Sequence, residues 1–171
     1  MNDKTNEMPH PRGPGKWADP TVPKGGWEGT GVEDLGRPKH RCQMCESVTV
    51  RRVHMMEHPD YPEILGVGYV CAANMEGGYA GVEKREKELR NRLARRGRWL
   101  TRRWRSLGDG GQTLVAYGYR TTVTPRDEAW EVVVTLKNGS NAWVLDDFTQ
   151  LDAAKLAGFD HIEVVGRLSL R

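Results

Sequence analysis

The chain has 171 residues, a formal net charge of +3 and a hydrophobic content of 37%. A chain of this length can form one ordinary domain or two small ones, and the low hydrophobic content indicates that part of it is not packed. No apolar run approaches the roughly 18–20 residues of a membrane span, and the first residues lack the apolar core of a secretory signal. We therefore expect a soluble, cytoplasmic protein with two small domains and a tail.

The positive charge is concentrated in one region of the sequence. Residues 41–107 contain 14 of the 26 Lys and Arg residues and eight acidic residues, whereas residues 108–171 contain six basic and nine acidic residues. All three cysteines lie in the same basic region. The regional excess of positive charge indicates a nucleic-acid partner, and the odd number of cysteines argues against a disulfide framework.

Residues 1–40 are predicted to be a disordered tail. They contain six prolines and seven glycines, with Trp17 and Trp27 as the large aromatic residues. Such a segment buries too little apolar surface to offset the entropy that it loses on ordering. The two tryptophans add a second expectation, since an aromatic side chain in a Gly- and Pro-rich strip is typical of a segment that docks on a surface.

Residues 41–80 are predicted to form a small zinc-stapled β-hairpin module. Cys42 and Cys45 have the Cys-x-x-Cys spacing of structural zinc sites, in which a tight turn directs both sulfurs at one metal ion. Strand-like runs at residues 48–53 and 64–70 predict a hairpin that leads to Cys71 and a short helix. This order of knuckle, hairpin and helix resembles a treble-clef zinc finger over residues 40–77, although the second Cys-x-x-Cys of that fold is absent.

The fourth zinc ligand is predicted to be His54. If the hairpin turns near residue 61, Cys71 lies across from position 51, so that His54 is within a few residues of the metal, while His58 is roughly 20 Å away at strand rise. His40 is the alternative ligand, and three reduced, inert cysteines are the alternative to a metal site. A zinc ion with four protein ligands has no open position, so its role is structural. The predicted ligands are Cys42, Cys45, His54 and Cys71.

A competing pattern, His54-Met-Met-Glu57-His58, matches the His-x-x-Glu-His motif of inverted zinc hydrolases. In that motif two histidines one helical turn apart bind zinc and the glutamate acts as base. The β-branched residues before the pattern and Pro59 directly after it disfavour the helix that the motif requires. A metal-dependent hydrolase or nuclease is therefore the weakest functional hypothesis.

Residues 81–108 are predicted to form one basic amphipathic helix. At 100° per residue, six apolar residues from Val82 to Leu107 fall within an arc of about 60°, and the opposite face is cationic. Arginine contacts phosphate through a planar fork, and Trp99 lies off the apolar seam, where it would add a base-stacking surface. An acidic protein and plain solvation are the alternatives for the cationic face. The predicted nucleic-acid-binding residues are Lys84, Lys87, Arg95, Arg98, Arg102, Arg105 and Trp99.

Residues 112–171 are predicted to form a small α+β domain. The expected strands are residues 114–124, 130–136 and 141–145, with an Asn-Gly hairpin turn between the last two, and a helix over residues 151–159 precedes an extended piece from residue 162. This order resembles the three-strand-plus-helix DNA-binding domain of ethylene-response factors and phage integrases. The resemblance implies that the sheet face reads DNA, whereas the net charge of −3 over residues 108–171 argues against direct groove reading. A protein-docking domain and a stabilising domain are the alternatives.

The complete pattern predicts an α+β protein and resembles small proteins of phages and other bacterial mobile elements. The first functional hypothesis is a non-enzymatic nucleic-acid-binding protein, in which zinc holds the base of the helix and arginines grip the backbone of DNA or RNA. The second hypothesis is an inhibitor or adaptor that binds a bacterial nucleoprotein complex.

Overall fold

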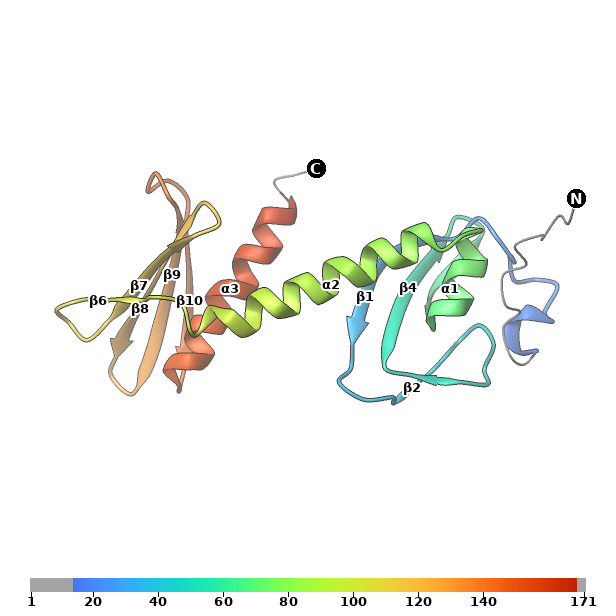
Figure 1. The fold of residues 1–171 in the computed structure, drawn as a ribbon, viewed down its shortest axis with the longest axis horizontal. Helices are drawn as coiled ribbons and strands as arrows, with labels where there is room; N and C mark the ends of the chain where they lie inside the picture. The colour runs from blue at the N-terminus through green and yellow to red at the C-terminus, as the bar shows by residue number, and fades with distance from the viewer. Residues whose placement is uncertain (1–13, 169–171) are drawn as a thin grey trace, which may run out of the picture. The chain divides into compact units, whose positions relative to one another are not determined.

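The computed structural model describes residues 14–168, and the chain divides into two compact units, unit 1 with residues 1–91 and unit 2 with residues 92–171. The fold class is α+β, as predicted (Figure 1). Helix α2 (Ala80–Trp99) begins in unit 1 and ends in unit 2. None of the helices within the described range is long and apolar enough to cross a membrane.

Unit 1 is built on a three-stranded antiparallel sheet in the order β1-β4-β5. The strands are β1 (Glu28–Asp34), β4 (Arg52–His58) and β5 (Tyr61–Val67). The predicted hairpin is therefore present, with its turn at residues 59–60. A smaller pair, β2 (His40–Arg41) and β3 (Thr49–Val50), encloses the Cys-x-x-Cys turn. Helix α1 (Tyr69–Glu76) follows the hairpin and stops at Gly77, whose φ of 75° is a left-handed conformation that glycine adopts without strain.

The predicted disordered tail differs from the structure over the residues described. Residues 15–17 form a 3₁₀ turn, η1 (Gly15–Trp17), and β1 pairs with β4 along its length. Val22 and Trp27 are each 4% exposed and belong to the core of unit 1. The segment has too few apolar residues to form a core of its own. It is ordered because it adds β1 to the sheet and Trp27 to the core, and other segments provide the rest of both. Residues 1–13 lie outside the described range.

Helix α2 is shorter than the helix predicted over residues 81–108. It ends at Trp99, whose carbonyl oxygen accepts hydrogen bonds from the backbone N–H of Arg102 at 3.4 Å and from the indole N–H of Trp104 at 3.2 Å. The chain then enters β6 (Arg105–Ser106). Apolar residues continue at helical spacing beyond the end of the helix, but Trp104 packs against the core of unit 2 from a loop.

Unit 2 is a five-stranded antiparallel sheet in the order β10-β9-β8-β7-β6, with helix α3 (Leu151–Leu168) along one face (Figure 1). The predicted strand at residues 114–124 is two strands, because Tyr117 and Gly118 adopt φ values of 55° and 83° and form a tight turn. The predicted Asn138-Gly139 turn is confirmed, with φ of 86° at the glycine. Helix α3 replaces the extended piece expected from residue 162. The remaining strands are β7 (Gln112–Ala116), β8 (Tyr119–Arg126), β9 (Ala129–Leu136) and β10 (Ala142–Phe148).

Candidate metal centre and basic surfaces

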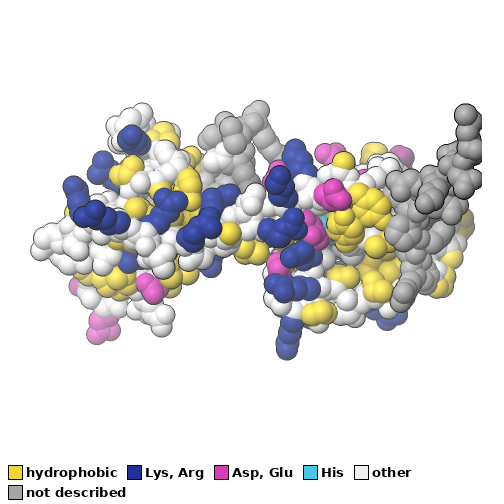
Figure 2. Space-filling model, viewed as in Figure 1, with side chains coloured by type: hydrophobic (Ala, Val, Ile, Leu, Met, Phe, Trp, Pro, Cys, Tyr) yellow, Lys and Arg dark blue, Asp and Glu magenta, His cyan; other side chains and the backbone are white. Residues whose placement is uncertain are grey.

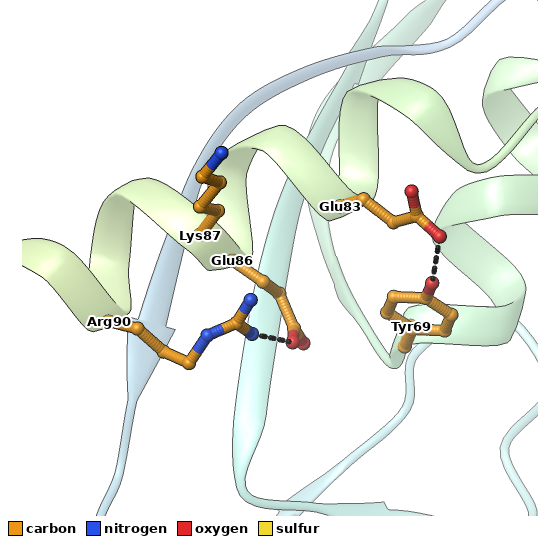
Figure 3. Close-up of a pocket in the computed structure, with 5 residues that line it drawn as sticks. All are labelled: Tyr69, Glu83, Glu86, Lys87 and Arg90. Atoms are coloured by element: carbon orange, nitrogen blue, oxygen red, sulfur yellow. Dashed lines mark hydrogen bonds and ion pairs between the residues drawn. The ribbon is translucent and has the colours of Figure 1, made fainter.

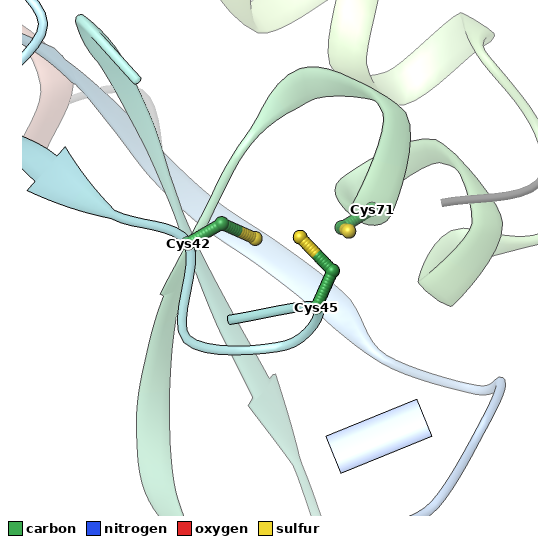
Figure 4. Close-up of side chains that lie close together, drawn as sticks. All are labelled: Cys42, Cys45 and Cys71. Atoms are coloured by element: carbon green, nitrogen blue, oxygen red, sulfur yellow. The ribbon is translucent and has the colours of Figure 1, made fainter. Parts of the chain in front are cut away.

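The three cysteines come together in the core of unit 1. Cys42 and Cys45 lie on the turn between β2 and β3, and Cys71 lies in α1. The turn is closed by the backbone N–H of Glu46, which donates to the carbonyl oxygen of Cys42 at 2.9 Å. All three side chains are buried and point toward one another (Figure 4), and their Sγ atoms lie within 4.8 Å of one another. The cluster can therefore bind one metal ion through three sulfurs.

The surroundings of the cluster stabilise a thiolate at Cys42. Its pKa is lowered to about 5, first by the hydrogen bond from the Cys71 thiol and then by backbone N–H groups that include Gly68, 3.4 Å from Sγ. The same hydrogen bond, together with burial, raises the pKa of Cys71. The Ser47 hydroxyl donates to Cys45 Sγ at 3.3 Å. Because the thiolate is the form that binds metals, this ring of donors suits a metal centre.

His54 does not join the cysteines. It is fully buried, and its Nε2 lies 3.5 Å from Oε1 of Glu86 on α2. Counting residues along the hairpin estimates how far His54 lies from Cys71 along the strand. It does not give the direction of the His54 side chain, which depends on how α2 packs against the strand.

The other two candidate histidines are also engaged elsewhere. His40 Nε2 lies 3.0 Å from the carbonyl oxygen of Gly66. The ring of His58 lies 5.3 Å from that of Trp27, and its Nδ1 accepts a hydrogen bond from the Asp60 N–H. Within residues 14–168, the group of side chains that can hold a metal ion is therefore the cysteine triad without a histidine.

The inverted hydrolase pattern is not formed. Residues 54–58 lie on strand β4 rather than on a helix. Four residues at strand rise separate the backbone positions of His54 and His58 by about 13 Å, which is too far for one metal ion. The two rings also contact different neighbours, Glu86 and Trp27.

Unit 1 contains a cavity of about 350 Å³ that is lined in part by Tyr69 and Glu86 (Figure 3). Its carboxylates are already engaged, since Glu83 accepts a hydrogen bond from the Tyr69 hydroxyl and Glu86 accepts from Arg52 at 2.8 Å. Burial, followed by the positive charge of Arg85, lowers the pKa of His54, so the imidazole is neutral. We interpret His54, Arg52 and Glu86 as the polar contact through which β4 packs against α2. The residues that line the cavity are Tyr69, Glu83, Glu86, Lys87 and Arg90.

Two residues that were predicted to bind nucleic acid instead make contacts within unit 2. Arg95 forms a bidentate ion pair with Glu163 of α3, with a shortest distance of 2.7 Å. Trp99 is 0% exposed, and its indole N–H donates to the carbonyl oxygen of Lys155 at 2.7 Å. A helical wheel shows which residues share a face, but it does not show that an acidic helix covers that face. Arg95 therefore holds α3, and Trp99 cannot stack on a base.

The other members of the predicted set are exposed. Lys84, Lys87 and Arg98 are exposed on α2, and no ion pair involves them in the described part of the chain. Arg102 lies beyond the helix, with its guanidinium 4.8 Å from the ring centre of Tyr117. Arg105 is exposed on β6.

The sheet of unit 2 has a second face, opposite α3, that carries threonines, valines and arginines. Strand register places Arg105 next to Thr113 on β7, Thr113 next to Thr122 on β8, and Thr122 next to Val133 on β9, in one row across this face. A second row contains Val115, Arg120, Thr135 and Ala142. The acidic residue at the edge of these rows, Glu131, pairs with Arg126 at 3.1 Å. We call these residues the open face.

Positive charge gathers on unit 2 although its C-terminal part is acidic. Residues 92–171 contain 13 Lys and Arg and nine Asp and Glu, and the acids of α3 at positions 160 and 163 are paired with arginines of α2. Figure 2 shows basic side chains gathered over unit 2, in the left part of the view. The sequence analysis missed Arg120, although the alternation Arg120, Thr122, Thr124 at period two is the signal that places these residues on one face.

Comparison with protein-family models, with curated proteins and with solved structures finds no match for this chain. The functional interpretation therefore rests on the geometry of the cysteine triad and of the open face.

Proposed function

We propose that the protein is a non-enzymatic nucleic-acid-binding protein, in which the open face of unit 2 contacts the phosphate backbone and a structural zinc ion held by the cysteine triad stabilises unit 1. The observation that carries the proposal is the position of Arg105 and Arg120 on the face of the sheet that α3 leaves uncovered.

The two arginines are suitably placed for a phosphate backbone. β7 lies between β6 and β8, and the two arginines stand in neighbouring rows, so the backbone positions of Arg105 and Arg120 are about 12 Å apart. Both side chains are exposed, and neither has an acidic partner among the described residues. Thr113 between them is buried and its hydroxyl donates to the carbonyl oxygen of Thr121 at 3.1 Å, so the two guanidinium groups, rather than this hydroxyl, make the proposed phosphate contacts. Contacts of this kind bind without strong sequence preference and weaken steeply with salt.

Zinc is the metal that best suits the triad. Three thiolates in a buried site favour zinc over hard cations such as Mg²⁺ and Ca²⁺, which prefer oxygen ligands. The site is far from solvent and has no carboxylate base among its ligands, which supports a structural role. In this proposal, zinc stabilises the module from which α2 begins.

The test is a salt titration of nucleic-acid binding by the full-length protein. Fluorescence anisotropy with labelled double-stranded DNA, single-stranded DNA and RNA gives log K against log salt for each. Arg105→Gln with Arg120→Gln should reduce the salt slope by about 2, since each lost phosphate contact reduces it by about 1. Arg37→Gln with Lys39→Gln, which removes two exposed charges from unit 1, is the control. Equal slopes for the two double variants would contradict the proposal.

A second candidate function is docking on an acidic protein surface, such as that of a bacterial nucleoprotein complex. It is favoured by two exposed valines, Val144 at 57% and Val115 at 43%. Strand register places Val144 next to Val133, so both lie on the open face. A protein partner would bury these valines, whereas a phosphate backbone would not require them. Val144→Ser should weaken binding to such a partner and leave anisotropy with nucleic acid unchanged.

A further inference from the structure

Tyr117 is the aromatic residue of unit 2 that faces solvent. It is 43% exposed, whereas the other Phe, Trp and Tyr residues between positions 14 and 168 are buried or half-buried. Tyr117 and Gly118 form the tight turn between β7 and β8, and both have a positive φ. Such turns favour Asn, Asp and Gly, which adopt this conformation with little strain. The turn itself therefore gives no reason for a large, exposed ring at this position.

The ring of Tyr117 is held in place by neighbouring side chains. The ring of Trp99 stacks on it at an interplanar angle of 15°, and Phe159 meets it edge-on with ring centres 6.4 Å apart. The guanidinium of Arg102 lies 4.8 Å from the ring centre and donates to the Tyr117 hydroxyl at 2.7 Å. A ring that is oriented before a ligand arrives loses little entropy when the ligand binds. Tyr117 thus provides a fixed, partly exposed aromatic surface beside a positive charge.

Tyr117 stands at the cationic end of the sheet. The turn of residues 137–141 lies beside it, because the Lys137 N–H donates to the carbonyl oxygen of Gly118 at 2.8 Å. These two turns contain one lysine and no acidic residue. The turns at the opposite end of the same strands contain Asp109, Asp127 and Glu128. An anionic ligand is therefore attracted to the end of the sheet that carries the ring.

The open face begins next to this ring. In the strand register, the residue pair that follows the turn is Ala116 with Tyr119, and the pair after it, Val115 with Arg120, belongs to the open face. Arg105 lies in the next row of that face. Neither of these arginines has an acidic partner among the described residues. Positive charge therefore continues from the ring along the open face.

We propose that the partner of this surface is a single-stranded nucleic acid, one of whose unpaired bases stacks on Tyr117 while Arg102 and the arginines of the open face contact the neighbouring phosphates. An aromatic platform beside a cationic track is the combination that binds single strands, because every base has a face that can stack. In a duplex the bases are paired and stacked on one another, so the ring has no base to contact. The inference rests on the proposed nucleic-acid-binding function and adds to it the strand state of the partner and a base contact.

Anisotropy with three labelled probes tests the proposal on the full-length protein. The probes are single-stranded oligothymidylate, the same backbone with abasic sites in place of the bases, and a duplex of equal length. Tyr117→Leu keeps an apolar side chain against Trp99 but removes the ring. It should weaken binding to oligothymidylate by about 5- to 150-fold, the range that stacking of one base supplies. Its salt slope should not change, because no phosphate contact is lost. Binding to the abasic and duplex probes should also be unchanged, which shows that the variant is folded.

Two variants are the controls. Tyr117→Phe keeps the ring and should retain most of the affinity for oligothymidylate, and Tyr79→Leu, which removes a half-buried ring from unit 1, should bind as the unaltered protein does. The base contact is wrong if Tyr117→Leu binds oligothymidylate normally, if it weakens binding to the abasic or duplex probe equally, or if either control loses as much affinity. In each of these cases a reduced salt slope of Arg105→Gln with Arg120→Gln would leave the nucleic-acid-binding function standing. If the unaltered protein binds none of the three probes, that function fails and the single-strand assignment fails with it.

Discussion

The Nε2 atom of His54 lies 3.5 Å from Oε1 of Glu86, which places a neutral imidazole of the central strand β4 against a carboxylate of α2. Arg52 from the same strand donates to the other carboxylate oxygen at 2.8 Å, and Arg90 lies 3.4 Å from that oxygen. The carboxylate of Glu86 is thus shared by three side chains. The joint between the hairpin and the helix depends on a histidine that remains uncharged.

This arrangement predicts a loss of stability in mild acid. Burial lowers the pKa of His54 in the folded protein, so the unfolded chain, with a histidine pKa of about 6.5, takes up the proton first. Stability is therefore full above pH 6.5 and falls as the pH drops below it, by up to about 1.4 kcal/mol between pH 7.5 and 5.5. Chemical denaturation at a series of pH values measures the effect.

His54→Gln should flatten this dependence over the same range, although the variant is less stable overall. Burial also lowers the pKa of His161, but His161 is present in both proteins, so the difference between their slopes isolates His54. Equal slopes for the two proteins would show that His54 is not buried as a neutral group.

The cysteine triad predicts a metal-dependent stability of unit 1. Cys42→Ser should reduce bound zinc from about one per chain to none, because two remaining sulfurs do not hold a structural ion, and the melting temperature should fall to that of the chelator-treated protein. Elemental analysis and thermal unfolding provide the two measurements. His54→Gln is the control and should retain the metal. Zinc retained by Cys42→Ser, or lost with His54→Gln, would contradict the assignment of the triad.

The arginines of α2 are predicted to separate into two classes. Arg95→Ala should destabilise the protein by about 1 kcal/mol, because it breaks the bidentate pair with Glu163, in which the carboxylate is only 13% exposed. Arg98→Ala should leave stability unchanged, since Arg98 is exposed and forms no ion pair within the described residues. Denaturant midpoints compare the two. The exchange Arg95→Glu with Glu163→Arg should recover stability that Arg95→Glu alone loses.

The sequence predicted the cysteine cluster better than its surroundings. Cys-x-x-Cys spacing is a local signal, and the order of hairpin and helix was sufficient to place Cys71 near it. The direction of His54 was not predictable in this way, because a strand residue faces whichever element packs on its side of the sheet. That element, α2, is distant in the sequence and was assigned a different role.

Local signals also fail where two structures share one pattern. The helix was predicted to continue past Trp99 because apolar side chains at helical spacing can also pack on a sheet from a loop. One long strand was predicted over residues 114–124 because the apolar run suits a strand, whereas the Tyr117-Gly118 turn divides it. The charge of the C-terminal part was misleading for a related reason. Summed along the sequence it is negative, but Asp160 and Glu163 of α3 are paired with arginines of α2, and Arg105 and Arg120 of the open face have no acidic partner among the described residues.

Trp99 provides a direct test of burial against base stacking. Its ring is stacked on that of Tyr117 with centres 6.1 Å apart, and it contacts Phe159 in the core of unit 2. Trp99→Ala should destabilise unit 2 by about 3–5 kcal/mol. Trp99→Phe keeps most of the packing but loses the hydrogen bond to Lys155, and it should bind nucleic acid with unchanged affinity under conditions in which it is folded. A large loss of affinity in folded Trp99→Phe would restore the stacking role.

Gly15 is predicted to be the most sensitive glycine of the metal centre. Its φ of 40° lies in the left-handed region, and a Cβ would meet the backbone of Met44 and Cys45 at 2.5–2.6 Å. Because backbone atoms cannot move aside as a flexible side chain can, Gly15→Ala should displace η1, destabilise unit 1 by more than about 1 kcal/mol and weaken zinc binding. Gly25→Ala, where a Cβ meets nothing within 4 Å, is the matched control, and denaturation with and without zinc compares them. If Gly15→Ala matches this control in both stability and zinc affinity, the N-terminal turn does not border the metal centre as described.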